Sequence, residues 1–324
     1  MWRRVDFSAV RRFTTENNAC KFCKNRSIAK TCAGAVGICR PAPDWVYAFC
    51  ARVAQGALSF GIFIANLIPM FNPTVSRSFV IPVLNFSPHS PYNIHTLLND
   101  LAGVQGEVIC IFNSQEVFEA LRAHPRIDKF AYNNLNPGVS RSWNQGLQLA
   151  EGEVVYVLNA DLHIGPKAIE ELEHYVLTLP RAVIVGPQGS WLDYPTLKVL
   201  RYFQKGEFIE PVCTHDVSGF CFAIHHERFV ASKLSFDNRF SPFFMEEWDI
   251  GLQAVQANLA CWTVPVVDFD HVWGVSGLPA DTQIEYFGRS VFRSAVHAEN
   301  QRKFVDKWFG KPVRTDPVQD STLR

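Results

Sequence analysis

Amide, carboxylate and imidazole side chains follow a strongly apolar run in the stretch EVVYVLNADLHIGP, residues 153–166. Five of its first six residues are apolar or aromatic, which predicts a strand buried on both faces. Asn159, Asp161 and His163 come next, before a Gly-Pro pair ends the pattern. Because ligands bind at the carboxyl ends of strands in open α/β sheets, we expect a binding site at this strand tip.

Two further groups of polar residues could act with this strand tip. The stretch FFMEEWDIG places Glu246, Glu247 and Asp249 at the start of an apparent helix. Glu246 and Asp249 are three residues apart and share a face, whereas Glu247 and Asp249 point in roughly opposite directions. Acids here would also stabilise the helix through its macrodipole. His271 follows another apolar run, near two aspartates that could orient its ring.

Alternating strand and helix patterns position these groups. From Ser76 onward short apolar runs alternate with amphipathic segments, which predicts βαβ units around a largely parallel sheet. We expect strands at 78–85, 107–113, 129–134, the opening of 153–166 and 181–187, and helices at 92–104, 140–150 and 167–179.

Several enzyme classes lack their signature in this sequence. No GxGxxG follows the first strand, and neither a GxxxxGK[ST] loop nor a GxSxG elbow occurs. The formal net charge is zero, which argues against nucleic acid as a partner. Carboxylate and histidine chemistry remains.

Six segments, in order, resemble family 2 glycosyltransferases with the GT-A fold, closest to the rhamnosyltransferase-like branch that builds bacterial surface polysaccharides. They are NLNPGVSRSWNQGL, VYVLNAD, DVSGFCFAIHHERF, FDNRFSPFFMEEWDIGLQAVQANLACWTVP, DHVWGVSG and NQRKFVDKWFG. The resemblance implies an α/β fold with a mixed, mostly parallel sheet flanked by helices. It also implies inverting transfer of a hexose or deoxyhexose from a nucleoside-diphosphate sugar to a glycan or lipid-linked acceptor.

The same resemblance implies a divalent metal, Mg²⁺ or Mn²⁺, that neutralises the leaving diphosphate. Asp161 would ligate this metal, His271 would complete its shell from the far side, and Asn159 would hydrogen-bond the nucleotide. A shifted register would instead pair Asp161 with His163. The residues expected to bind the donor are Asn85, Asn113, Asn136, Asn144 and Asn159.

An inverting transfer needs a carboxylate to take the proton of the acceptor hydroxyl. The resemblance assigns this role to Glu247, with Glu246 and Asp249 supporting it or binding the acceptor. Because the family commonly has the shorter Asp at the position of Glu247, Asp249 remains an alternative base.

The acceptor and the nucleobase are less constrained. The resemblance places Asp216 and Trp248 on the acceptor side, and the irregular, aromatic stretch 188–215 is typical of binding loops. Phe112 stands where the family commonly has an Asp that contacts the base or ribose, which leaves the nucleobase open. A catalytically inactive nucleotide-sugar or glycan-binding module on the same fold is the main alternative. A nucleotidyltransferase would need Gly and basic residues after the first strand, where NFSPHSPYN has neither.

We expect four regions along the chain. Residues 1–44 form a basic leader with nine Lys or Arg against three Asp or Glu, and it is either poorly ordered or carries a zinc knuckle at its CxxC. Residues 45–70 end in eighteen uncharged residues, either an anchor helix with a cytoplasmic N-terminus or a segment that precedes a true start at Met70. Residues 76–311 are the glycosyltransferase domain and 312–324 a tail. We therefore expect a cytoplasmic protein, with attachment to the cytoplasmic membrane as an open alternative.

Overall fold

The computed structural model describes residues 76–87, 90–272 and 278–310. The expected leader with its cysteines, the hydrophobic segment and the tail lie outside these described residues. Within them, no helix is both long and apolar enough to cross a membrane.

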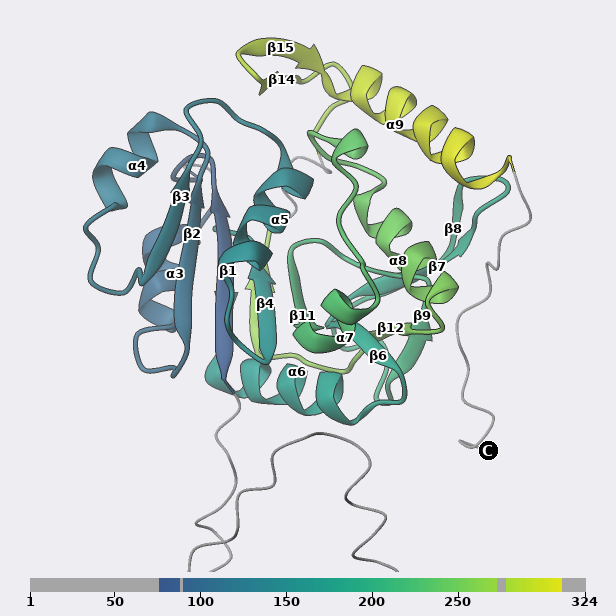
Figure 1. Ribbon diagram of the computed structural model, residues 1–324, viewed down its shortest axis with the longest axis horizontal. Helices are drawn as coiled ribbons and strands as arrows, with labels where there is room; N and C mark the ends of the chain where they lie inside the picture. The colour runs from purple at the N-terminus through teal and green to yellow at the C-terminus, as the bar shows by residue number, and fades with distance from the viewer. Residues whose placement is uncertain (1–75, 88–89, 273–277, 311–324) are drawn as a thin grey trace, which may run out of the picture. The chain divides into compact units, whose positions relative to one another are not determined.

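A central sheet of eight strands organises the described chain (Figure 1). Its order is β3-β2-β1-β4-β11-β6-β12-β9. Neighbouring strands are parallel except at β11, which is antiparallel to β4 and β6, and at β9, which is antiparallel to β12. The strands are β1 (Arg77–Val83), β2 (Glu107–Phe112), β3 (Lys129–Tyr132), β4 (Val154–Leu158), β6 (Ala182–Gly186), β9 (Val212–Thr214), β11 (Cys221–His225) and β12 (Ala260–Thr263).

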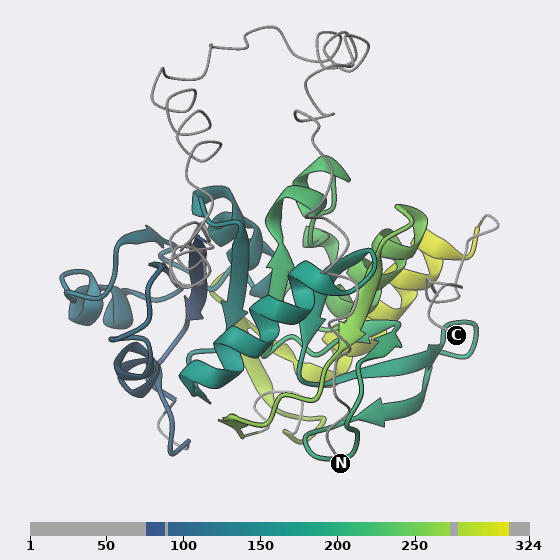
Figure 2. The same ribbon diagram turned by 90° about the horizontal axis from the view of Figure 1, so that it is seen from below.

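Helices cover both faces of this sheet, which confirms the expected α/β architecture. One face carries α3, α4 and α6, and α6 crosses in front of the strands in Figure 2. The other carries α5, α7 and α8. The helices are α3 (Ile94–Asp100), α4 (Gln115–Leu121), α5 (Val139–Leu149), α6 (Pro166–Thr178), α7 (His226–Ala231), α8 (Glu246–Gln256) and α9 (Arg293–Trp308).

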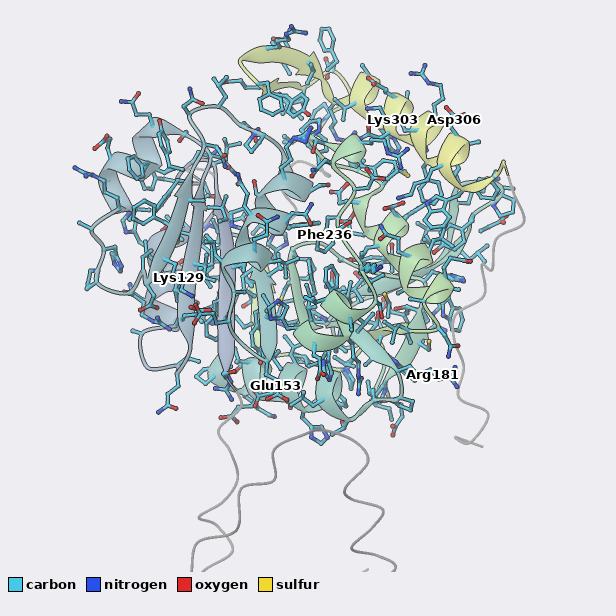
Figure 3. All side chains as sticks on the ribbon, viewed as in Figure 1. Lys129, Glu153, Arg181, Phe236, Lys303 and Asp306 are labelled. Carbon is cyan, nitrogen blue, oxygen red and sulfur yellow. The ribbon has the colours of Figure 1, made fainter. Side chains whose placement is uncertain are left out.

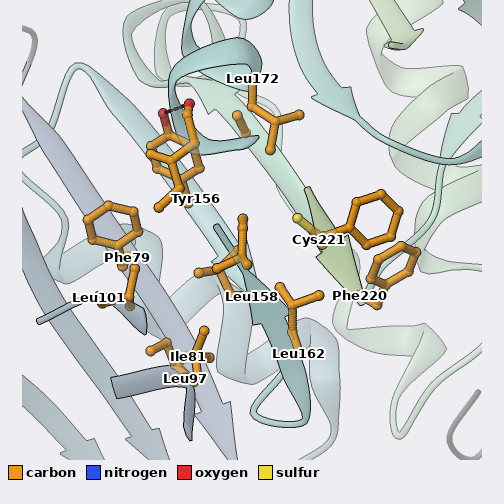
Figure 4. Packing of buried hydrophobic residues seen from close by; sticks show 14 of the residues in the cluster. Phe79, Ile81, Leu97, Leu101, Tyr156, Leu158, Leu162, Leu172, Phe220 and Cys221 are labelled. Carbon is orange, nitrogen blue, oxygen red and sulfur yellow. Dashed lines mark hydrogen bonds between the residues drawn. The ribbon is translucent and has the colours of Figure 1, made fainter. Parts of the chain in front are cut away.

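Aromatic side chains pack on both faces of the central sheet. Phe236, labelled at the centre of Figure 3, packs edge-on against Trp143 of α5 with ring centroids 4.8 Å apart. On the opposite face Phe79 of β1 stacks on Tyr156 of β4 at 5.0 Å (Figure 4). The Tyr156 hydroxyl donates to the carbonyl of Ile169 at 2.9 Å, so this large polar ring is buried without an unpaired group.

Smaller sheets frame the carboxyl ends of the central strands. They are β10-β7-β8, β13-β5 and β14-β15. Our expectation of irregular loops across 188–215 is wrong, because β7 (Gly189–Asp193) and β8 (Lys198–Phe203) form an antiparallel pair and β9 joins the central sheet. Aromatic residues on half-exposed strands obscured the two-residue period there. The remaining strands are β5 (Leu162–Ile164), β10 (Asp216–Val217), β13 (Phe269–His271), β14 (Gln283–Tyr286) and β15 (Arg289–Phe292).

Candidate active site

A carboxylate and an imidazole meet at the tip of β4. The short strand β5 follows this tip and pairs antiparallel with β13, which sets His271 opposite Leu162. Nε2 of His271 therefore lies 3.4 Å from Oδ1 of Asp161 and 3.4 Å from Nδ2 of Asn159. Three residues expected at one site are brought together by strand pairing.

The ring of His271 is held in a fixed plane. It stacks on Phe220, with ring centroids 4.5 Å apart and an interplanar angle of 8°. The Asp161 and His271 side chains are 20% and 11% exposed, so both are largely buried but still reach solvent.

The Asp161–His271 pair fits a divalent cation. It supplies one carboxylate and one imidazole nitrogen directed at each other, and its partial exposure leaves room for oxygen ligands from a phosphate or water. The described residues contain no group of three or more His, Cys, Asp or Glu that could hold a metal alone. The cation would therefore need ligands from outside the protein.

His163 points to different neighbours. Its Nδ1 lies 2.9 Å from Oδ2 of Asp100, and its ring stacks on Tyr92 at 5.4 Å. The shifted register, which pairs Asp161 with His163, is thus not the arrangement found. In the structure Asp161 faces His271.

A second group of acids, Glu246, Glu247 and Asp249, lies in the first turn of α8. The two residues before this turn have an unusual backbone conformation. Phe244 and Met245 both have positive φ angles, 76° and 75°, which non-glycine residues rarely adopt. Asn300 of α9 fixes this segment, because its buried amide donates to the carbonyls of Phe240 and Phe243 at 2.6 and 2.8 Å and to that of Phe244 at 3.3 Å. A residue in the last described helix thereby positions the turn that presents the acids.

Glu247 has the environment of a proton acceptor near neutral pH. The backbone N–H of Gly219 donates to its Oε1 at 3.2 Å. Burial, and to a lesser extent the charge of Asp216, raise the pKa of Glu247 to about 7. A Cβ at Gly219 would lie only 2.5 Å from the same Oε1, so glycine is required for this close approach.

Glu246 is more deeply buried, with 3% of its surface exposed. Burial, followed by the charge of Glu247, raises the pKa of Glu246 well above its ordinary value. Its Oε2 has no hydrogen-bond partner among the described residues.

Asp249 faces away from the other two acids and ties α8 to α9. Its Oδ1 accepts from the indole N–H of Trp308 at 2.7 Å, and Nζ of Lys307 lies 2.7 Å from the same oxygen. Fully buried and paired in this way, it is poorly placed for the alternative base. Trp248 packs in the apolar cluster of Tyr194 and Phe304.

One cavity of about 290 Å³ joins the two groups. Asn159 and His271 line one part of it, and Glu246, Glu247 and Gly219 another. The remaining described lining residues are Val139, Trp143, Gln188, Tyr202, Ser218, Phe220, Phe243, Phe244 and Phe269.

Of the five asparagines expected to bind donor, Asn159 is the one that lines this cavity. Asn144 binds the backbone of Phe236, because its Nδ2 donates to the Phe236 carbonyl and its Oδ1 accepts from the Phe236 N–H. Asn136 donates to the carbonyl of Glu285. Asn113 is buried and donates to the hydroxyl of Ser142. The fifth, exposed at the end of β1, is Asn85, whose side chain accepts from the backbone of Ser87.

Asp216 lies beneath the site. Its Oδ1 accepts from the backbone N–H and the hydroxyl of Ser190 at 2.6 and 2.7 Å. Burial raises its pKa to about 6. It therefore acts on the cavity through its charge on Glu247 and through the placement of β10 beside β7.

A chain of neutral hydrogen-bonding groups in the cavity was not expected from the sequence. The hydroxyl of Tyr202 donates to Oε1 of Gln188 at 2.7 Å and lies 2.8 Å from the hydroxyl of Ser218. These residues come from three different segments, and no spacing in the sequence links them.

Comparison with known proteins identifies similar families and folds. The family model described as "Glycosyl transferase family 2" matches residues 78–229. No curated protein sequence matches the chain. Among solved structures, GalNAc-T7 with UDP, GalNAc and Mn²⁺ is 14% identical with a TM-score of 0.56, covering 74% of this chain and 49% of that chain. S. aureus TarS 1-349 in complex with UDP-GlcNAc is also 14% identical, with a TM-score of 0.46, covering 64% and 62% of the two chains.

The chain spans about half the length of GalNAc-T7, and this likeness shows a shared fold. The described chain therefore has the GT-A glycosyltransferase fold, and its residues 78–229 match glycosyl transferase family 2.

Proposed function

We propose that the protein is an inverting, metal-dependent glycosyltransferase that moves a sugar from a nucleoside-diphosphate sugar to a glycan or lipid-linked acceptor. The observation that carries the proposal is the single cavity lined both by His271, which faces Asp161, and by Glu247. Leaving-group stabilisation and proton removal need such groups on opposite sides of one reacting sugar.

Glu247 is the proposed general base. With a pKa of about 7, it is ionised in a large fraction of molecules at neutral pH and still basic enough to take a hydroxyl proton. The Gly219 N–H holds Oε1, which leaves Oε2 to accept the proton as the acceptor oxygen attacks the anomeric carbon.

Asp161 and His271 are the proposed ligands of Mg²⁺ or Mn²⁺, with Asn159 beside them to contact the diphosphate. The bound cation would neutralise charge on the departing nucleoside diphosphate. The GalNAc-T7 structure contains UDP and Mn²⁺, which supports the same ligand class here.

The finer features are also proposed. We infer that the transferred sugar is a hexose or deoxyhexose, that the closest relatives are the rhamnosyltransferase-like branch, and that the product is a surface polysaccharide. We further infer action in the cytoplasm, with attachment to the cytoplasmic membrane through a segment outside the described residues.

Calorimetric titration with UDP-, GDP- and dTDP-sugars, with and without Mn²⁺, tests the proposal. We expect one nucleotide class to bind only with Mn²⁺ and this binding to be lost in Asp161→Ala and His271→Ala. Glu247→Gln should keep binding but lose transfer. His163→Ala should also keep binding, because His163 pairs with Asp100 instead.

Two results would contradict the proposal. If a folded protein binds no nucleotide sugar, the transferase function is wrong. If it binds a donor but releases no nucleoside diphosphate, with or without acceptor, the protein is a catalytically inactive nucleotide-sugar-binding module.

A further inference from the structure

His271 lies on β13, a strand of three residues that pairs with β5 and with no third strand among the described residues. The pairing consists of three residue pairs in antiparallel register. Two-stranded ribbons are at best marginally stable by themselves. The position of His271 relative to Asp161 therefore depends on the contacts that hold the edges of the β5-β13 ribbon.

Both edges of this ribbon present backbone groups that the strand pairing does not use. At its end the Gly165 N–H donates to the carbonyl of Asp268 at 2.8 Å. Opposed residues of antiparallel strands alternate between hydrogen-bonded and non-hydrogen-bonded pairs, and Phe269 lies opposite Ile164 as the next pair. The backbone N–H and carbonyl groups of these two residues therefore point outward, where they need other partners.

A charged side chain binds each edge of the ribbon. Oδ2 of Asp100, the last residue of α3, accepts from the Ile164 N–H at 3.2 Å on the β5 edge. Nζ of Lys205, in the segment between β8 and β9, donates to the carbonyl of Phe269 on the β13 edge. The strand that carries His271 is thus held by a lysine from outside the ribbon.

Lys205 is itself fixed by its neighbours. Its Nζ lies 3.0 Å from Oδ1 of Asp270 and 5.0 Å from the centre of the Phe269 ring. The hydroxyl of Tyr92 donates to Oδ2 of Asp270 at 3.4 Å. Because successive side chains of a strand point to opposite faces, Asp270 projects away from the face that carries His271. It locates the ammonium group of Lys205 from that outer face.

We propose that Lys205 is a positioning residue that holds His271 opposite Asp161 for cation binding. The inference rests on the proposed function, in which these two side chains bind Mg²⁺ or Mn²⁺. The Phe269 ring packs 5.7 Å from that of Phe220, on which the His271 ring stacks. The hydrogen bond from Lys205 therefore fixes the backbone two residues before His271 and also the residue that supports its stacking partner.

Charge and positioning predict opposite changes when Lys205 is replaced by Met. Removing a positive charge near a cation site reduces repulsion and strengthens cation binding. Removing a positioning contact weakens cation binding, because the ligand must then be ordered as the cation binds. The sign of the change in cation affinity therefore distinguishes the two roles.

Calorimetric titration of Mn²⁺ into the full chain with excess UDP, corrected for Mn²⁺ binding to UDP alone, measures this change. GDP or dTDP replaces UDP if it is the nucleotide that binds. Lys205→Met should weaken Mn²⁺ binding about threefold to tenfold, the value of one hydrogen bond. Lys205→Arg keeps a charged donor and should recover most of the affinity. Lys167→Met is the matched control, since Lys167 makes an exposed ion pair with Glu171 on α6.

Kinetics and urea denaturation separate positioning from a general structural role. In Lys205→Met the Mn²⁺ concentration for half-maximal donor hydrolysis should rise by the same factor, while kcat at saturating Mn²⁺ stays the same. The urea midpoint should be unchanged, because the side chains of Lys205 and Asp270 are 38% and 58% exposed and exposed ion pairs contribute little stability.

Unchanged or tighter Mn²⁺ binding in Lys205→Met would overturn the inference, as would an equal loss of affinity in Lys167→Met. Both results leave the proposed function intact, because the unaltered chain still binds Mn²⁺ and the nucleotide. If the unaltered, folded chain binds no Mn²⁺ with UDP, GDP or dTDP, the proposed function fails together with the positioning role.

Discussion

Replacing Glu247 with Gln should stabilise the folded protein while it removes transfer activity. In the folded state the pKa of Glu247 is about 7, compared with 4.5 for an unperturbed Glu. The carboxyl group therefore keeps its proton to higher pH in the folded protein than in the unfolded chain. Its cost to folding is absent below about pH 4.5, grows as the pH rises, and is complete above about pH 7.

The size of this effect follows from the two pKa values. One pH unit of difference corresponds to about 1.4 kcal/mol, so the rise from 4.5 to about 7 corresponds to about 3 kcal/mol. The Gln side chain can still accept from the Gly219 N–H but carries no charge. Glu247→Gln should therefore be more stable than the natural protein by about 3 kcal/mol at pH 8, and of nearly equal stability at pH 4.5.

Urea denaturation of both proteins between pH 4.5 and pH 8 measures this difference, alongside sugar transfer at pH 8. Loss of the base should lower transfer by about 10²- to 10⁴-fold. The control is Glu153→Gln, an exposed residue that precedes β4 and so lies at the opposite end of this strand from Asn159 (Figure 3). Equal stability of the natural protein and Glu247→Gln at pH 8, or a gain that does not shrink as the pH falls, would refute the reasoning.

Three other substitutions probe how the acids are held. Asn300→Ala removes the donor to three carbonyls, so the free energy of unfolding in urea should fall by about 1–3 kcal/mol. The kcat should also fall while nucleotide binding persists, and an unchanged kcat would contradict the positioning role. Gly219→Ala places a methyl group 2.5 Å from Oε1 of Glu247, so transfer should drop at least tenfold in a protein whose circular dichroism is unchanged; full activity would contradict this. Lys307→Met leaves Asp249 buried without its cation, so the free energy of unfolding measured by denaturation should fall by about 3–5 kcal/mol. An unchanged free energy of unfolding would show that the carboxyl group is satisfied without Lys307.

The fold was predictable because its strands are buried on both faces. Continuous apolar runs such as Val154–Leu158 predict a buried strand directly, because no alternation of polar and apolar residues has to be detected. The predicted helix 92–104 is shorter in the structure, ending at Asp100, although Leu101 remains buried beside it. The half-exposed β7-β8 pair was missed, because burial does not impose a clear pattern there. The short elements β5, β9, β14, β15 and α4 were not predicted either.

The position of Asp161 was predictable for a related reason. Asp161 follows directly from a buried strand, so its position at the sheet edge needs no tertiary information. Which histidine, His271 or His163, lies against Asp161 did depend on tertiary structure. His163 is two residues from Asp161 and His271 is 110 residues away, yet the β5-β13 pairing brings the distant one to 3.4 Å.

The roles of the three acids of α8 depend on tertiary contacts that no local pattern encodes. All three lie in the first helical turn. From the sequence alone, acids at this position are explained equally well by stabilisation of the helix dipole and by a catalytic role. Asp249 is bound by Lys307 and Trp308 and so links α8 to α9. Glu247 accepts a hydrogen bond from the Gly219 N–H, and Glu246 lines the cavity.

Burial without a cation then separates the two remaining acids. Burial, followed by the charge of Glu247, raises the pKa of Glu246 well above its ordinary value, whereas burial raises the pKa of Glu247 to about 7. Two adjacent glutamates thereby differ in how readily they ionise, and the proposed base is the one that ionises more readily. The difference arises from α9, the Gly219 backbone and the strained turn at Phe244, which belong to distant parts of the chain and meet only in the folded protein.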